Sequence, residues 1–562
     1  MPSRWLSIIL VVMIGAQILV AGCALMLIGN ELATAVLCQD HLREQIYAAS
    51  RRKWDFRRKG GKKWQRRSGG KGRGRPREKP PKDGESAWWA EPVASVPKLN
   101  LAAQDVEQWA EELQDYHGLY RPLFQRREQR EWSALYLRGL LSDVPKNKSI
   151  ESMMLALHGA EANAIRDMQH FISQGAWADE PILTRHQSQV NQTLAEEDGV
   201  YILDGSDFLK QGEETVGVNR QWCGEAGKVA NCVAGVFLGY ASRKGYTLLD
   251  RRLYLPEEWV TDEAYAESRQ RTGIPDETEF KTKPKLGTEM LQGLYDADVL
   301  QGRWLAADEA FGRDTAFLDR VDELGLWYFA EVPHDTRAWT QRPATHVPEG
   351  SGRGRKPTRE RLVEGEPDAQ QVVALAAFLP SDRWSRQLIK EGSKGPIIAD
   401  FAVLRVVAVR DSLPGPQVWL VLRRHVETGE LKTYLSNAPA QITFQALVRL
   451  SGMRWPIETC FEESKQHLGM GDFQIRSWRG WHHHMTLCIL AHFFLVLIQL
   501  NLHNKAPVLT LPQIVLIVAS VLPTRTRNAL WALEVVTYRQ QRNHAAYLSH
   551  RKRRMALLAL IE

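Results

Sequence analysis

The sequence predicts an α/β protein in which a helical segment precedes a mixed core of strands and helices. Two observations support this prediction. Across residues 100–196, apolar residues such as Val106, Trp109 and Leu113 recur every three or four positions, which is the period of an amphipathic helix. From Val200 onward, short apolar runs alternate with helical stretches, which is typical of strands that are connected through helices.

The helical segment has a basic character. Helices are expected over three of its stretches, Glu131–Leu141, Ser149–Leu157 and Ala162–Ser173. Four arginines lie in the same segment: Arg126, Arg127, Arg130 and Arg138. They indicate either a surface that contacts nucleic acid or an ordinary charged helical face. The acidic residues Asp204, Asp308 and Glu458, which are discussed below, favour the first interpretation.

The core has a recognisable order of elements. Strands are expected at Val200–Asp204, Cys232–Tyr240, Tyr246–Tyr254, Trp304–Asp308 and Trp327–Val332, with helices at Leu286–Tyr295 and Thr315–Leu324. Three strands in hairpin succession, followed by alternating helices and strands, is the order of an RNase H-like fold. In that order the first and fourth strands are neighbours, so Asp204 and Asp308 are expected to meet.

A second strand-rich region interrupts this core. Strands are expected near Ile397–Arg410, Val418–Val426 and Leu431–Leu435, and they are followed by helices at Phe444–Arg454, with Thr443 as N-cap, and Ile457–Leu468. Met485–Leu500 is apolar but short, which favours a core helix over a membrane span. The tail from Arg525 to Arg554 is basic and predicted helical.

These patterns divide the chain into seven parts. They are an apolar N-terminal segment (1–50), a basic disordered linker (51–99), a helical DNA-binding domain (100–196), the first part of the RNase H-like core (197–333), a strand-rich insertion (334–440), the second part of the core (441–505) and a basic helical tail (506–562).

Charge and cysteine content narrow the class of protein. The net charge of +7 and the isoelectric point of about 9.0 favour an anionic partner such as nucleic acid. The six cysteines show no Cys-x-x-Cys spacing, which argues against a zinc ribbon or a disulfide framework and favours a reducing compartment.

The N-terminal part allows several interpretations. The run from Leu6 to Gly29 is long enough to span a bilayer, but it also fits a buried helix or an upstream extension with no role. The linker contains Lys71-Gly-Arg-Gly-Arg-Pro-Arg77, which resembles an AT-hook, so Arg73 and Arg75 are candidate contacts to a narrow minor groove. The alternative is a solvated basic linker.

Three acidic residues are the strongest indication of chemistry. Asp204 and Asp308 each end an apolar run, and Glu458 lies in a predicted helix between Arg454 and Lys465. Two aspartates and one glutamate provide the carboxylates that hold a pair of magnesium ions, which is the arrangement for cutting phosphodiesters.

The predicted helix that carries Glu458 contains a second candidate metal ligand, and its charges can also be explained without a metal site. Glu462 lies one turn further along the same face and is the alternative metal ligand. Arg454 and Lys465 on that face suit a DNA backbone. The simpler explanation of these charged residues is a surface helix that is stabilised by ion pairs.

Several longer stretches resemble the DDE transposases of bacterial insertion sequences, specifically the insertion-sequence seven-hundred-and-one family. They are Ile202-Leu-Asp-Gly-Ser-Asp-Phe208, Val216 to Cys232, Leu249 to Trp259, Ala307-Asp-Glu-Ala-Phe-Gly312 and Arg454-Trp-Pro-Ile-Glu458 through Lys465. The resemblance covers about residues 100 to 500.

The resemblance implies specific roles. Asp204, Asp308 and Glu458 would be the catalytic triad and the ligands of two Mg²⁺ ions, which Mn²⁺ can replace. Arg454 and Lys465 match the family's tyrosine–arginine–glutamate–lysine signature, whereas its tyrosine position falls on Ser451.

The resemblance also implies partners and a location. The partners would be double-stranded DNA, at the element ends and at the target, and a second copy of the chain on that DNA. The location would be the cytoplasm in association with the nucleoid, with an N-terminal membrane segment left open.

Other candidates and rivals remain. Arg220, Lys228 and the neighbouring Gln221 and Asn231 are either DNA contacts or solvated loop residues, and the consecutive histidines 482–484 fit a helix start better than a metal site. The departure at Ser451 motivates a rival function, an inactive DNA-binding protein derived from a transposase. A membrane-anchored protein with an incidental nuclease-like core is the second rival.

Overall fold

The computed structural model describes residues 99–562, apart from 146, 300, 349–357, 393–394, 503–504, 507–508 and 559–562. The predictions for the apolar segment and for all but the last residue of the linker, including Arg73 and Arg75, therefore lie outside the described residues. Glu85–Glu562 is one compact unit, in which the helical segment and the core pack together.

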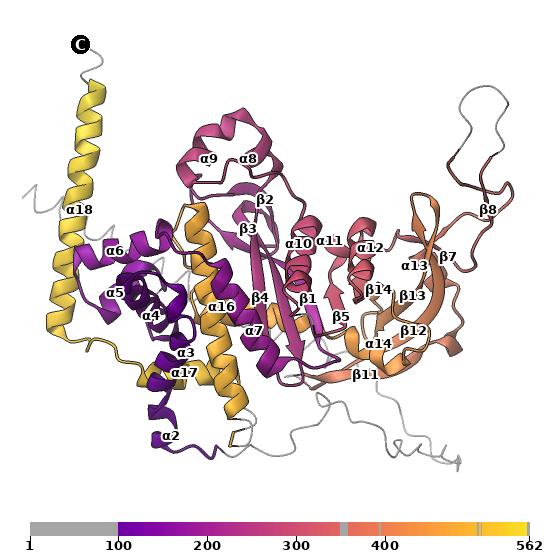
Figure 1. The fold of residues 1–562 in the computed structure, drawn as a ribbon, viewed down its shortest axis with the longest axis horizontal. Coiled ribbons are helices and arrows are strands. Elements are labelled where there is room, and N and C mark those ends of the chain that lie inside the picture. Colours follow the sequence, from indigo (N-terminus) through magenta and orange to yellow (C-terminus); the bar gives the residue numbers. More distant parts are fainter. Residues whose placement is uncertain are drawn as a thin grey trace, which may run out of the picture. The chain divides into compact units, whose positions relative to one another are not determined.

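One large sheet runs through the described part of the chain (Figure 1). The strands are β1 (Val200–Leu209), β2 (Asn219–Cys223), β3 (Lys228–Ser242), β4 (Gly245–Tyr254), β5 (Trp304–Ala307), β6 (Trp327–Glu331), β7 (Arg337–Trp339), β8 (Thr345–His346), β9 (Arg361–Leu362), β10 (Gln370–Gln371), β11 (Ser385–Gly392), β12 (Gly395–Arg410), β13 (Leu413–His425) and β14 (Leu431–Ser436). All of them belong to this sheet except β8 and β9, which pair with each other.

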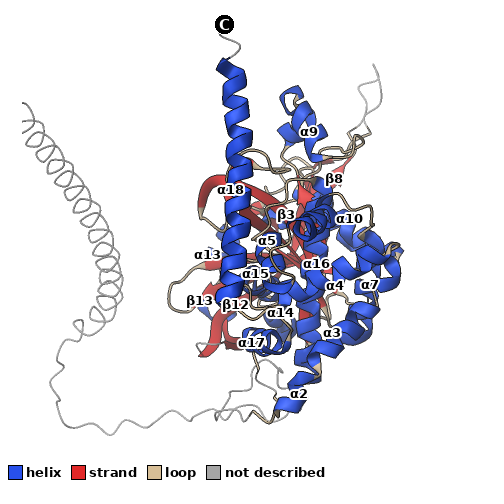
Figure 2. Cartoon of the chain, turned by 90° about the vertical axis from the view of Figure 1, so that its left-hand side faces the viewer, coloured by secondary structure: helices blue, strands red, loops and turns tan. Residues whose placement is uncertain are grey.

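Helices surround the sheet, as Figure 2 shows in blue against red strands. They are α2 (Ala103–Glu107), α3 (Trp109–Gly118), α4 (Arg127–Leu141), α5 (Ile150–Leu157), α6 (Ala162–Ser173), α7 (Glu180–Leu194), α8 (Glu257–Thr261), α9 (Ala266–Thr272), α10 (Lys283–Asp296), α11 (Glu309–Gly312), α12 (Thr315–Glu323), α13 (Val372–Ala377), α14 (Phe444–Leu450), α15 (Trp455–His467), α16 (Trp478–Asn501), α17 (Leu511–Val521) and α18 (Ala529–Leu558).

The core strands have the RNase H-like order that the sequence predicts. β1 pairs antiparallel with β3, and β3 with β4, whereas β1 pairs parallel with β5, and β5 with β6. The strands therefore lie in the order β4-β3-β1-β5-β6. The parallel pairs need crossover connections, which α10 and α12 provide.

The register between β1 and β5 brings Asp204 beside Asp308. The parallel ladder runs from Val200 opposite Trp304 to Leu203 opposite Ala307. The residue that follows the ladder is an aspartate on both sides, Asp204 after Leu203 and Asp308 after Ala307. The expected end of the first strand at Asp204 is wrong, because β1 continues to Leu209 through its antiparallel pairing with β3. Asp204 thus lies within a strand at the point where its parallel neighbour ends.

The edge strand β2 was not expected from the sequence. It pairs with the start of β3, with Arg220 opposite Asn231 and Cys223 opposite Lys228. Its polar residues alternate without a continuous apolar run, and Trp222 is 66% exposed, so the usual signal of a buried strand is absent. Arg220 therefore lies in a strand, and not in a loop between strands.

The insertion extends the core sheet. β14 pairs antiparallel with β6 through Tyr434 opposite Glu331, and β13, β12 and β7 come next in turn. The three predicted strands correspond to β12, β13 and β14. β11 was missed because its sequence is largely polar, although it pairs with β12 over most of its length.

The helical segment contains the three expected helices with nearly the expected bounds. Ser149 caps α5 by accepting a hydrogen bond from the Ser152 amide. The segment packs on α16, where the Tyr116 hydroxyl donates to the Leu490 carbonyl at 2.9 Å. α16 is apolar and long enough to cross a membrane, but 83% of its most apolar window is buried inside the protein, as in a core helix.

The two helices around Glu458 differ from expectation at their junction. Thr443 caps α14 as predicted, by accepting from the Ala446 amide, but α14 ends at Leu450 instead of Arg454. Pro456 lies in the first turn of α15, where its missing amide hydrogen costs nothing. It therefore starts a new helix and does not kink a longer one, and Arg454 becomes the N-cap residue.

The close approach of α11 to β6 predicts a sensitive position at Gly312. A Cβ there would overlap the carbonyl oxygen of Glu331, so Gly312→Ala should lower the free energy of unfolding by about 1–3 kcal/mol in urea denaturation. Gly293→Ala is the control, because this exposed position of α10 has nothing within 4 Å of the added Cβ. The control should gain about 0.5–1 kcal/mol. Equal stability of the two variants would contradict this packing.

Candidate active site

Asp204 is a nearly buried carboxylate at the centre of the sheet. It is 8% exposed. Its Oδ1 accepts a hydrogen bond from the Gly205 amide at 2.7 Å, and its Oδ2 accepts one from Arg454 Nη1 at 2.6 Å. The strand order places it here, because β1 lies between β3 and β5.

Asp308 is held at the start of a short helix. Its Oδ1 accepts hydrogen bonds from the amides of Ala310 at 3.0 Å and Phe311 at 3.4 Å, so it is the N-cap of α11. The preceding strand β5 is buried along its whole length, which fixes where the cap begins. The carboxylate is thereby oriented by backbone donors beside Asp204.

Arg454 connects Glu458 to Asp204. The Arg454 guanidinium contacts Asp204 through Nη1, and its Nη2 lies 2.5 Å from Glu458 Oε1. Arg454 precedes α15 and Glu458 lies in its first turn, so both side chains point from one end of this helix. The structure therefore brings together Asp204, Asp308, Glu458 and Arg454.

The rival carboxylate Glu462 has a different environment. It is exposed, and it accepts a hydrogen bond from Gln466 one turn along α15. The adjacent Glu463 is buried, where it accepts from Tyr246 and contacts His492. The geometry thus favours Glu458 over Glu462.

The site concentrates negative charge around the buried Asp204. The pKa of Asp204 is raised to about 7, chiefly by burial and also by the charges of Asp308 and Glu458, against the lowering effect of Arg454. Burial also raises the pKa of Asp308. Burial alone would lower the pKa of Arg454, but the surrounding carboxylates, Asp204 first, raise it above its usual value. Arg454 therefore provides the positive charge that partly balances the carboxylates of Asp204, Asp308 and Glu458, which together form the acidic group.

The donor set fits divalent cations by its chemistry. Three carboxylates, two with raised pKa values, surround a single guanidinium, and hard oxygen ligands of this kind are what Mg²⁺ and Mn²⁺ prefer. Among the described residues no three His, Cys, Asp or Glu side chains are already gathered as ligands. Arg454 lies between Asp204 and Glu458 instead.

Lys465 links α15 to the β2–β3 hairpin. Its Nζ donates to the Asp207 carbonyl and to Glu225 Oε2, each at 2.7 Å, and it lies 4.8 Å from the centre of the Phe208 ring. Glu225 belongs to the turn between β2 and β3. Arg220 and Lys228 lie exposed on this same hairpin, so the hairpin carries two of the predicted cations beside the helix of Glu458.

Ser451 is directed away from the acidic group. Its hydroxyl donates to the Val448 carbonyl, and its own carbonyl accepts from Arg423. The buried Tyr434 of β14 instead lies within electrostatic range of Arg454. Sequence reasoning missed Tyr434, because only the pairing of β14 with β6 brings it toward the site.

Two further lysines near the site were also missed. Burial raises the pKa of Asp308, and Arg454 and, to a smaller extent, Lys283 at the start of α10 partly oppose this rise. Lys390 of β11 lies 4.7 Å from the centre of the Trp455 ring and interacts electrostatically with Glu458. Neither lysine stands in a motif, and Lys390 belongs to a strand that the sequence did not predict.

The three consecutive histidines are structural. His483 lies between the carbonyls of Ile172 and Trp177, and His484 hydrogen-bonds Tyr136 and the Met470 carbonyl. Burial lowers the pKa of both, to about 3 for His483 and about 4 for His484. They are neutral core residues that join the helical segment to α16.

The chain is similar in sequence to known proteins. A family profile described as DDE superfamily endonuclease matches residues 119–396, a span that contains Asp204 and Asp308 and ends before Glu458. A probable transposase for insertion sequence element IS701 from Microchaete diplosiphon is 22% identical over 314 residues, which cover 55% of this chain and 68% of that protein.

One solved structure is also similar. It is a cryo-EM structure of a piggyBac transposase synaptic complex with hairpin DNA, with a TM-score of 0.36 and 10% identity. The match covers 74% of this chain and 80% of that one.

The raised pKa of Asp204 predicts a pH-dependent stability in chelator-treated buffer. Its pKa of about 7 in the folded chain exceeds the ordinary 3.8, so its stabilising contribution is present below pH about 4 and is lost as the pH rises through 7. Asp204→Asn cannot titrate. Urea denaturation should show wild type losing stability relative to this variant by at most about 1.4 kcal/mol per pH unit in that window. A difference independent of pH would refute the assignment.

Proposed function

This chain belongs to the DDE transposases of the IS701 type, and we propose that it cleaves DNA at the ends of a mobile element and transfers those ends to target DNA. The observation that supports the proposal most directly is the meeting of Asp204, Asp308 and Glu458 around Arg454. Three carboxylates from separate parts of the chain have no structural need to meet around one arginine, because their mutual repulsion is costly, most of all for the buried Asp204.

The proposed reaction consists of two phosphoryl transfers. Water attacks the phosphorus at the element end, the bond to the 3′ oxygen breaks, and that oxygen leaves as a free 3′-hydroxyl. This hydroxyl then attacks a phosphodiester of the target, and one ester bond replaces another without an external energy source. Two magnesium ions, or manganese in their place, would activate the attacking oxygen and stabilise the leaving one.

The residues of the chain have distinct proposed roles. Asp204, Asp308 and Glu458 would hold the metal ions. Asp308 is kept in place by the amides of α11, and Glu458 by the start of α15. Arg454 neutralises the carboxylates in the free protein, and the DNA phosphate is a natural alternative partner for its guanidinium.

The surrounding cations fit a DNA backbone. Lys465, Arg220 and Lys228 lie on α15 and the adjacent hairpin, and Lys283 and Lys390 approach from α10 and the insertion. The helical segment would bind the terminal inverted repeats. Because two element ends must be brought together, the working form would be a dimer on DNA, in the cytoplasm and associated with the nucleoid.

An inactive DNA-binding descendant of a transposase is the second candidate. The observation that favours it is Ser451, whose hydroxyl caps α14 and contributes nothing to the acidic group. Tyr434 from the insertion, however, lies within electrostatic range of Arg454 and hydrogen-bonds Arg423, so a tyrosine from another element is present near the site. A strand-transfer assay with Mg²⁺ or Mn²⁺ on the cognate ends separates the two candidates.

Asp308→Asn should abolish cleavage and retain DNA binding. Asparagine keeps an oxygen for the amides of α11 but loses the charge that holds metal, so the rate of strand cleavage should fall by more than about 100-fold. Cleavage of a labelled duplex that carries the element end measures the effect, and EDTA added to wild type should reproduce it. Unchanged cleavage by the variant would show that the metal site lies elsewhere.

The pair Glu458→Gln and Glu462→Gln tests the choice between two carboxylates on one helix. We expect the first variant to lose cleavage to a similar extent as Asp308→Asn. The second variant should cleave at a rate close to wild type, because Glu462 is exposed and hydrogen-bonds Gln466 one turn along the helix. The reverse result would move the metal role to Glu462.

A further inference from the structure

The C-terminal helix α18 is anchored over its first part and stands clear of the protein over the rest (Figures 1 and 2). Val535 and Tyr538 are buried, and the Trp531 indole donates to the Leu155 carbonyl at 3.1 Å. Arg542 pairs with Glu151 of α5. From Asn543 to Ala556, in contrast, every residue is exposed.

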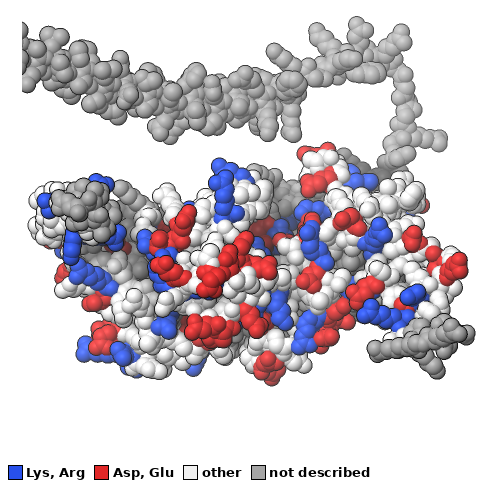
Figure 3. Space-filling view, turned by 90° about the horizontal axis from the view of Figure 1, so that it is seen from above, with Lys and Arg blue, Asp and Glu red and all other residues white. Residues whose placement is uncertain are grey.

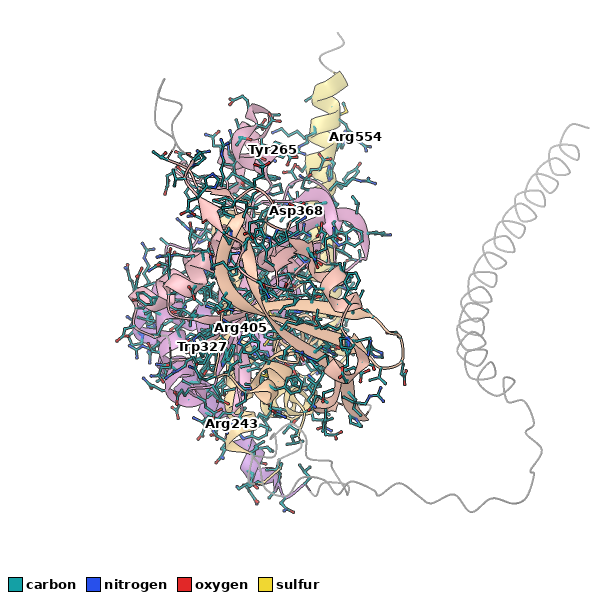
Figure 4. The ribbon with its side chains drawn as sticks, turned by 90° about the vertical axis from the view of Figure 1, so that its right-hand side faces the viewer. Arg243, Tyr265, Trp327, Asp368, Arg405 and Arg554 are labelled. Atoms are coloured by element: carbon teal, nitrogen blue, oxygen red, sulfur yellow. The ribbon has the colours of Figure 1, made fainter. Side chains whose placement is uncertain are left out.

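The free part of α18 is strongly basic. The sequence has no Asp or Glu between Glu534 and Glu562, and it has four consecutive cations at Arg551–Arg554. Within the described part of the chain, no hydrogen bond or ion pair involves these four side chains. Figure 3 shows basic side chains around this end of α18 and acidic ones over the middle of the same face, and Arg554 is labelled on the protruding helix in Figure 4.

This part of α18 lacks the packing that normally holds a helix in place. Its Arg, Lys, Gln and Ala residues have high helix propensity, so the helical conformation is locally favoured. Helices without tertiary contacts are nevertheless only marginally stable in water. We propose that the exposed half of α18 is a DNA-binding helix that lies in a groove of the duplex, in contact with backbone phosphates.

The arrangement of the cations favours a groove over a flat surface. Consecutive residues of an α-helix are about 100° apart, so Arg551–Arg554 encircle the helix. A major groove presents phosphates along both walls and admits an α-helix. The exposed stretch of 14 residues from Asn543 to Ala556 is about 21 Å long, enough to follow such a groove over several base pairs.

Two other occupants fit less well. A helix on a membrane surface needs one continuous apolar face opposite its cations, and cations on all sides of α18 prevent that. A coiled coil with a second copy needs apolar residues at alternating spacings of three and four. Leu548 and Met555 are seven residues apart, but Arg551 occupies the position between them that would have to be apolar.

The anchor of α18 connects it to the helical segment. Glu151 and Leu155 both belong to α5, so the projecting helix extends from the segment proposed to recognise the element ends. The inference rests on the proposed function in taking DNA as the partner, but it does not depend on cleavage.

The test uses the full chain and measures DNA affinity in EDTA, where no cleavage occurs. The variant R551Q/K552Q/R553Q/R554Q keeps helix-forming residues and removes four charges. Fluorescence anisotropy with a labelled duplex should show at least about a tenfold loss of affinity at low salt. The slope of log affinity against log salt should become shallower by about 3–4. The control R551K/R553K/R554K keeps the charge and should bind like wild type, and a chain that ends at Arg542 should show the same loss as the glutamine variant.

The outcomes are distinguishable. Equal affinity and equal salt slope for wild type and the glutamine variant would overturn the inference while leaving the proposed function intact. If wild type itself failed to bind DNA, the proposed function would fail. Unchanged DNA binding, together with lost binding to phosphatidylserine vesicles or lost self-association in analytical ultracentrifugation, would assign α18 to a membrane or to a second copy, and would also overturn the inference.

Discussion

The pairing of β1 with β5 is the constraint on which the rest of the site depends. It is a parallel ladder of only four residue pairs, and it ends with Leu203 opposite Ala307. A shift of one residue would turn every side chain of β5 to the other face of the sheet, so the buried apolar residues of both strands fix the register strongly. This register leaves Asp204 and Asp308 side by side, and α15 needs only to supply the third carboxylate and its arginine.

Placing the buried carboxylate of Asp204 beside those of Asp308 and Glu458 is unfavourable, and the chain offsets this cost in two ways. Backbone amides satisfy one oxygen of Asp204 and one of Asp308, and Arg454 provides a positive charge shared by Asp204 and Glu458. A buried charge without a partner would be far more costly than a buried pair. Arg454 therefore keeps the acidic group compatible with the fold when no other cation is present.

The sequence predicts those parts of the structure that local patterns encode. The apolar runs of β1 and β5, the cap at Thr443 and the spacing of Arg454 and Glu458 are all readable within a few residues. The polar strands β2 and β11 give no such signal, because their stability comes from pairing with neighbours that are already in place. Tyr434, Lys283 and Lys390 reach the acidic group only through long-range packing. No periodicity in the sequence indicates their positions.

The insertion explains why Glu458 is so far from Asp308 along the chain. Its strands continue the sheet outward from β6, and β11 returns toward α15, where Lys390 lies against Trp455. Trp455 is the first residue of α15, so this contact bears on the end of the helix that carries Arg454 and Glu458. The added strands therefore form part of the scaffold that holds the third carboxylate near the two aspartates.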